Sequence, residues 1–119
     1  MSAEENKALI RRFVETVWNN KQIDALDEFH AAEYLHNGKP DTAANFKERL
    51  RGYFANVPDL HNTIHDMIAE DDRASFRWAM TGTDQTTGKQ AVYRGITFYR
   101  IVDGKIVEDW NNAEHLAEE

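Results

Sequence analysis

A carboxylate near the end of the chain is the first candidate for chemistry. Glu114 lies four residues after Trp110, the last residue of the segment 95–110. Within this segment, Asp103-Gly104 separates two runs rich in β-branched and aromatic residues. Asp-Gly between such runs predicts a tight β-hairpin, because both central residues of a type I′ turn need positive φ. A glutamate acting as general base needs a raised pKa, which requires removal from water. We therefore expect Trp110 to line a pocket beside Glu114; alternatively, Glu114 is a solvated carboxylate of the acidic tail and Trp110 an ordinary core residue.

Histidine 36 is the second candidate, because imidazole is the side chain best matched to proton transfer near pH 7. His36 follows Tyr34 in an irregular stretch, residues 32–40. We expect it to assist Glu114, with an exposed loop histidine as the alternative. His61 and His65 do not predict a metal site, because residues four apart on a strand are ~13 Å apart, too far to share one ion.

Aromatic and cationic side chains elsewhere are candidates for binding a ligand. We expect Trp78 and Phe54, together with Trp110, to offer apolar surface to a substrate. Arg77 lies beside Trp78, and a guanidinium inside a small pocket binds a carboxylate or an enolate well. The alternative places Arg77 on a solvent-facing or dimer-forming surface.

Composition limits the classes of function. The 119 residues predict a single domain, residues 1–119, and the net charge of −7 argues against nucleic acid as a partner. The chain has no cysteine, hence no disulfide and no thiolate chemistry. No signal peptide and no apolar run of ~20 residues is present, so we expect a cytoplasmic protein that does not enter a membrane. Phosphate-binding loops and metal-ligand clusters are also missing from the sequence, so no cofactor and no metal is implied.

The first half of the chain predicts three helices. Ser2 and Glu5 fit a capping box, and the apolar residues behind them recur at helical spacing until Asn19. Its expected buried face carries Ile10, Phe13, Val14, Val17 and Trp18. A shorter helix is expected around residues 23–29. A third helix is expected to begin after Asp41 as N-cap and to end at Pro58.

The second half predicts an antiparallel sheet. From Leu60 onward the apolar period changes to two, with Leu60, Ile64 and Ile68 on one face of the first strand. The next strand is cleanly patterned and carries Phe76, Trp78 and Met80 on one face. Turns are expected at residues 71–72, 86–89 and 103–104. Helices followed by about four long strands predict an α+β fold with the helices covering one face of the sheet.

These elements resemble the SnoaL-like polyketide and ester cyclases, a branch of the nuclear transport factor 2-like superfamily. The resemblance spans nearly the whole chain and rests on three pieces in order: Pro58-Asp59-Leu60-His61, Arg77-Trp78 with Thr81-Gly82-Thr83, and Tyr99-Arg100 through Trp110. It implies a strongly curved antiparallel sheet wrapped around helices to form a cone with an internal cavity. In the family's cyclases a carboxylate four residues after the hairpin Trp is the general acid/base of a cofactor-free aldol ring closure.

The chain departs from the family pattern at three places. The carboxylate position holds Glu114 where the cyclases have Asp, and Asp84 stands where many ester-cyclase relatives have His. Residues 84–88 turn back at once where those relatives make a long excursion.

Two functions follow as hypotheses. One is a cofactor-free acid/base enzyme, a cyclase, isomerase or hydratase, acting on a small hydrophobic carbonyl compound through Glu114 and His36. The other is a non-catalytic module that binds a small ligand or a protein. A homodimer through the uncovered sheet face is also expected, with Tyr93, Tyr99 and Ile101 as its apolar residues if they face away from the helices.

Overall fold

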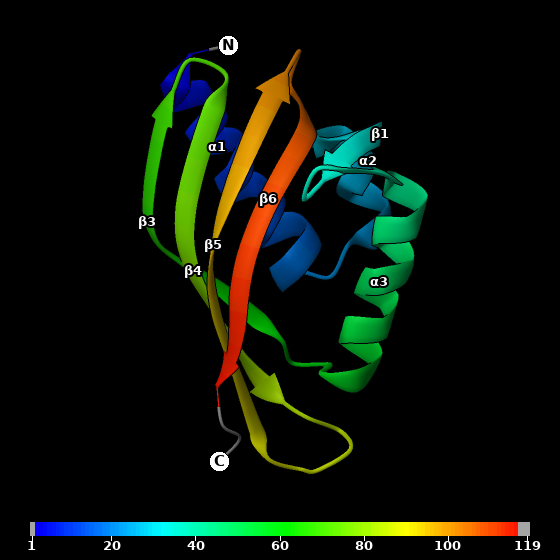
Figure 1. The fold of residues 1–119 in the computed structure, drawn as a ribbon. Coiled ribbons are helices and arrows are strands. Elements are labelled where there is room, and N and C mark those ends of the chain that lie inside the picture. The colour runs from blue at the N-terminus through cyan, green and yellow to red at the C-terminus, as the bar shows by residue number, and fades with distance from the viewer. Residues whose placement is uncertain (1, 117–119) are drawn as a thin grey trace.

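A computed structural model describes residues 2–116 as a sheet with helices packed on one side (Figure 1). The helical elements are α1 (Ala3–Phe13), the π-helix η1 (Val14–Asn19), the 3₁₀-helix η2 (Ile23–Ala25), α2 (Leu26–Phe29) and α3 (Ala43–Asn56). The strands are β1 (His30–His36), β2 (Lys39–Thr42), β3 (His61–Glu70), β4 (Arg73–Thr83), β5 (Gln90–Val102) and β6 (Lys105–Leu116). No helix within the described residues is long and apolar enough to cross a membrane.

The first helix begins as the sequence predicts. Ser2 Oγ accepts the N–H of Glu5, and the Glu5 carboxylate accepts the N–H of Ser2, which completes the capping box. The helix then widens into the π-helix η1, and its predicted apolar face, including the fully buried Ile10, Phe13 and Val17, packs into the core.

The third helix begins one residue later than expected. Thr42, not Asp41, is its N-cap, because the Thr42 hydroxyl accepts the Asn45 N–H at 3.1 Å. Asp41 instead accepts hydrogen bonds from the Thr42 N–H and the Asn45 amide. Its other oxygen, Oδ2, pairs with the cavity-lining Arg49.

The sheet has six strands in the order β2-β1-β6-β5-β4-β3, and it is mixed, whereas the sequence predicts an antiparallel sheet. The four long strands are antiparallel neighbours as predicted, but β1 pairs parallel with β6. The stretch assigned as irregular in fact forms the β1–β2 hairpin. Its turn is Asn37-Gly38, with φ of 50° and 83°, which satisfies the same requirement for positive φ as Asp103-Gly104.

Two β-bulges change which side chains face the helices. In β6, Arg100 pairs with Glu108 and Ile101 with Ile106, so Val107 is an extra residue. In β3 the register shifts between Ile64 and Asp66. Because side chains alternate along a strand, each extra residue moves all later side chains to the opposite face.

The bulge in β3 corrects one predicted face. Ile68, expected on the same face as Leu60 and Ile64, is 73% exposed. In β4 no bulge intervenes, and Phe76, Trp78 and Met80 are buried together as predicted.

Candidate functional site

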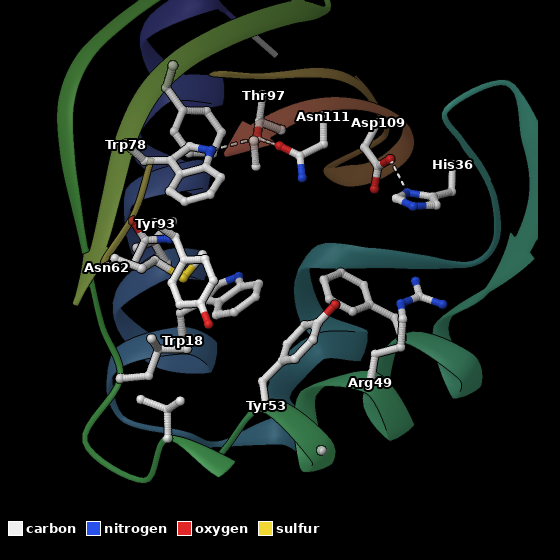
Figure 2. Close-up of a pocket in the computed structure, with 18 of the residues that line it drawn as sticks. Trp18, His36, Arg49, Tyr53, Asn62, Trp78, Tyr93, Thr97, Asp109 and Asn111 are labelled. Carbon is white, nitrogen blue, oxygen red and sulfur yellow. Dashed lines mark hydrogen bonds and ion pairs between the residues drawn. The ribbon is translucent and has the colours of Figure 1, made fainter. Parts of the chain in front are cut away.

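A cavity of about 460 Å³ lies between the helices and the inner face of the sheet. Its volume is in the range of pockets that hold drug-sized ligands. Aromatic rings form much of its wall, with Trp18 and Tyr53 stacked at 6.1 Å between centroids and Trp78 and Tyr93 contributed by the sheet (Figure 2). The cavity therefore suits a flat, largely apolar molecule.

A histidine–aspartate pair lies at one end of this cavity. His36 Nδ1 is 2.6 Å from Asp109 Oδ1, and both residues line the cavity (Figure 2). Asp109 is only 7% exposed. Burial raises the pKa of the Asp109 carboxyl above its ordinary value, and the hydrogen bond from His36 only partly opposes this. A carboxylate so placed is a stronger base than one in water.

The parallel pairing of β1 with β6 brings these two residues together. His36 and Asp109 are register partners, and the Asn37 N–H donates to the Asp109 carbonyl oxygen at 2.9 Å. Asn37 Oδ1 in turn accepts the Asn111 N–H at 2.8 Å. Two hydrogen bonds, to Asp109 and to Asn111, thus hold the Asn37-Gly38 turn against β6.

Trp110 packs on this turn from outside the cavity. A Cβ added to Gly38 would lie 3.1 Å from the Trp110 ring, and the Trp110 indole N–H donates to Glu108 at 2.6 Å. The residue is 46% exposed and does not line the cavity, so its predicted role as pocket wall is wrong. Its contact with Gly38 makes it a support for the turn that carries His36.

A chain of hydrogen bonds orients the amide of Asn111 beside Asp109. The Trp78 indole N–H donates to Thr97 Oγ1 at 2.8 Å, and that hydroxyl donates to Asn111 Oδ1 at 2.8 Å (Figure 2). Since an indole can only donate, the Thr97 hydroxyl accepts from Trp78, and its own proton is directed to Asn111 Oδ1. The Asn111 NH₂ group consequently points away from Thr97 and toward the cavity.

Arg49 supplies a cation to the same end of the cavity, and that cation is already paired. It lies 3.0 Å from Asp41 Oδ2 and donates to the Tyr34 hydroxyl at 2.8 Å. Partial burial raises the pKa of Asp41, but hydrogen bonds from Thr42, Asn45 and Arg49 outweigh this effect and lower that pKa to about 2. Asp41 is therefore an anion that neutralises the charge of Arg49. Asp109 is the carboxylate at this end of the cavity whose pKa is raised.

His30 is buried behind this cluster without lining the cavity. Its ring lies 4.2 Å from the Tyr34 ring, and burial lowers the pKa of the imidazole. His30 Nδ1 donates to the Ala31 carbonyl oxygen at 2.9 Å. It is a neutral packing residue in this position.

The structure places Glu114 outside the cavity, so the prediction of a buried Glu114 is wrong. Its side chain is 56% exposed on the outer face of the sheet and forms an ion pair with Arg94 on β5. Two features explain the error. The bulge at Val107 turns Trp110 and Glu114 to the outer face together, and β6 continues as a strand to Leu116 instead of curling back over the cavity.

Of the remaining predicted residues, two line the cavity and two do not. His36 and Trp78 line the cavity as expected. Arg77 faces outward and pairs with Asp66 at 2.6 Å, so it does not line the cavity. Phe54 packs against Trp18 beside the cavity wall and does not line it either.

Sequence reasoning missed Asp109 and Asn111, the polar residues of β6 that face inward. The Asn-Gly pair after His36 was a usable signal, because a hairpin there places β1 in the sheet. Tyr93 and Tyr99 also line the cavity and Ile101 is buried, so they do not form the outer apolar face. That face carries Ile96, Phe98 and Trp110 instead.

No metal site accompanies these residues: within residues 2–116, no group of three or more His, Cys, Asp or Glu side chains is placed to hold an ion.

The chain belongs to the SnoaL-like polyketide cyclase family, whose model matches residues 8–118. The solved structures it is similar to confirm the α+β, nuclear transport factor 2-like fold. AclR, a putative hydroxylase from Streptomyces galilaeus, is 25% identical, with a TM-score of 0.83 over 95% of this chain and 91% of that one. TsrD from Streptomyces laurentii superposes with a TM-score of 0.86 at 20% identity, over 96% of this chain and 91% of that one.

A third similar structure is itself a SnoaL-like polyketide cyclase. The SnoaL-like polyketide cyclase from Agrobacterium tumefaciens is 20% identical, with a TM-score of 0.81 over 89% of this chain and 88% of that one. Comparison with curated protein sequences gave no match. The family resemblance read from the sequence is therefore confirmed, and the family and these neighbours support a cyclase- or hydroxylase-like role.

Proposed function

We propose that this protein is an acid/base enzyme that closes a ring in an aryl carbonyl compound without a cofactor, with Asp109 as general base. The observation that carries the proposal is the Asp109–His36 pair, 2.6 Å apart, at the end of a cavity lined mainly by aromatic and aliphatic side chains. Family membership supports the same reaction class. Asp109 thereby replaces Glu114 as the proposed general base.

The proposed reaction needs only groups that the cavity contains. Asp109 removes a proton from the carbon next to a carbonyl group, and the C–H electron pair becomes an enolate. The enolate carbon attacks a second carbonyl carbon of the same molecule, which forms the new C–C bond and an alkoxide. The alkoxide takes the proton back from Asp109, so the carboxylate is regenerated and no co-reactant is consumed.

Two neighbours assist Asp109. The Asn111 NH₂ group, fixed by Thr97, donates a hydrogen bond to the enolate oxygen as negative charge develops there. His36 holds Oδ1 of Asp109, so Oδ2 is the oxygen that meets the substrate. In Figure 2 this second oxygen points into the cavity.

Proton abstraction can be measured without knowing the natural substrate. Ethyl benzoylacetate carries an acidic carbon next to an aryl ketone, and its hydrogen–deuterium exchange in D₂O is followed by NMR below neutral pH, where uncatalysed exchange is slow. We expect the wild-type protein to accelerate exchange and Asp109→Asn to reduce that acceleration at least ~100-fold, on the scale of general-base catalysis.

Glu114→Gln is the matched control, because it neutralises a carboxylate of the same strand on the outer face. It should exchange at the wild-type rate. Wild-type exchange no faster than in buffer, or an Asp109→Asn variant as active as the wild type, contradicts the proposal.

A further inference from the structure

Asn62 is a polar residue of the cavity wall that has no role in the proposed chemistry. Asn62 on β3 lines the cavity and is 5% exposed. Its Oδ1 is buried and has no hydrogen-bond partner among residues 2–116. Buried amide groups are nearly always hydrogen-bonded, because leaving one unpaired costs the free energy of its lost hydration. Among the buried polar atoms without a partner in residues 2–116, this oxygen is the one whose residue lines the cavity, which makes Asn62 the candidate for a contact with a ligand.

The backbone of Asn62 is held by hydrogen bonds to the Asn19 side chain. β3 is an edge strand, and the Asn19 side chain caps its free edge by accepting the Asn62 N–H at 2.7 Å and donating to the Asn62 carbonyl oxygen at 3.0 Å. The Lys21 ammonium donates to the Leu60 carbonyl oxygen at 2.7 Å. The amide is thus presented from a fixed position, which lowers the entropy cost of binding through it.

Asn62 lies at the opposite end of the cavity from the catalytic pair. Asn62 pairs with Met80 on β4, and Met80 pairs with Tyr93 on β5. Asp109 pairs with Tyr99, which is six residues further along β5. That spacing is roughly 20 Å measured along the strand. Figure 2 shows the two groups on opposite sides of the ring-lined space.

We infer that Asn62 binds a hydroxyl group at the far end of an elongated, flat aryl ketone whose reacting carbon lies at Asp109. A hydroxyl both donates and accepts, so it satisfies a carboxamide that presents either its oxygen or its NH₂ group. The group is neutral, because the charged cavity-lining residues Arg49 and Asp109 are at the other end. The inference rests on the proposed function for the identity of the reacting end, and adds a specificity-determining residue and a substrate class.

The test compares two ligands that differ by one hydroxyl group. 4-Acetyl-4′-hydroxybiphenyl and 4-acetylbiphenyl both carry a methyl ketone at one end, and their dissociation constants are measured by isothermal titration calorimetry. We expect the wild-type protein to bind the hydroxylated ligand about tenfold more tightly, the effect of one well-formed hydrogen bond. Asn62→Leu should reduce this ratio to about 1.

Asn112→Leu is the matched control, because Asn112 is an exposed residue of the same type that does not line the cavity. It should keep the tenfold preference. If Asn62→Leu does not fold, Asn62→Val gives the same comparison with a residue that strands favour. A purely structural Asn62 would weaken both ligands equally and leave the ratio unchanged.

Three results overturn the inference: equal affinities in the wild type, a preference that survives in Asn62→Leu or Asn62→Val, or no binding of either ligand. The ratio is an equilibrium quantity and can be measured in Asp109→Asn as well. A preference for the hydroxylated ligand in a protein without exchange activity refutes only the proposed reaction. An active enzyme without the preference refutes only the role of Asn62.

Discussion

Replacing Thr97 with Val removes the central hydroxyl of the Trp78–Thr97–Asn111 chain while keeping nearly the same side-chain shape. Thr97 is 6% exposed and Trp78 is 5% exposed, so water cannot readily replace the missing acceptor. The Trp78 indole N–H, which donates to Thr97 at 2.8 Å, is left buried without a partner. The Asn111 amide is at the same time released from its fixed orientation.

The size of the effect follows from these contacts. An unpaired buried donor costs about 1–3 kcal/mol of unfolding free energy. The added methyl group of Val returns at most ~0.8 kcal/mol through apolar burial. Taking the middle of that range, about 2 kcal/mol, the net loss is about 1–2 kcal/mol. For 119 residues the unfolding entropy is about 0.25 kcal/mol/K, so Tm should fall by ~4–8 °C.

Thermal unfolding followed by circular dichroism measures this change. Thr81→Val is the control, because Thr81 lies on β4, also in the sheet, but is exposed. Its unfolding free energy should change by less than ~0.5 kcal/mol. If Thr97→Val melts within a degree or two of the wild type, the hydrogen-bond chain does not hold Asn111 as we argue.

Three further predictions concern other parts of the molecule. Burial raises the pKa of Asp109 above its ordinary 3.8, so the folded protein retains this proton at pH values where the unfolded chain has released it. The stabilisation from this group is therefore present at low pH and is lost as pH rises from about 4 through the raised pKa. In urea unfolding, the unfolding free energy of Asp109→Asn minus that of the wild type should be larger at pH 7 than at pH 3. Gly38→Ala should destabilise the protein by about 1–2 kcal/mol, because Gly38 has φ of 83° and a Cβ would press on Trp110. Gly52→Ala in α3, where a Cβ meets nothing within 4 Å, should stabilise it by about 0.5–1 kcal/mol in the same urea assay, and equal effects of the two changes would contradict this contrast. We also propose a homodimer through the outer sheet face, where Ile96 is 55% and Trp110 46% exposed. Light scattering should give twice the monomer mass of 13.8 kDa for the wild type and the monomer mass for Ile96→Arg, while a monomeric wild type would refute the interface.

The local signals in the sequence were sufficient for most of the elements. The Ser2–Glu5 capping box and the Asp103-Gly104 turn depend on nearby residues, so sequence alone predicted them correctly. The period-two pattern of Phe76, Trp78 and Met80 also survived, because β4 pairs with β5 without a break in register.

The site was harder to predict because it depends on register across the sheet. Without a bulge, Ile106, Glu108 and Trp110 would share the inner face; the extra Val107 gives that face to Asp109 and Asn111 instead. Nothing in the apolar pattern of residues 105–110 marks that bulge. His36 was found for its chemistry, but its partner became visible only with the parallel pairing of β1 and β6.

That parallel pairing also has a consequence for the order of folding. His36 and Asp109 are 73 residues apart in sequence, and β6 is the last described strand of the chain. Contacts of such long range close large loops and form slowly compared with hairpins such as β3–β4. We expect the helices and the hairpins to fold before β1 and β6 meet. Ligand binding at Asp109 during refolding should then appear only in the slowest phase, so that recovery of binding marks completion of the sheet.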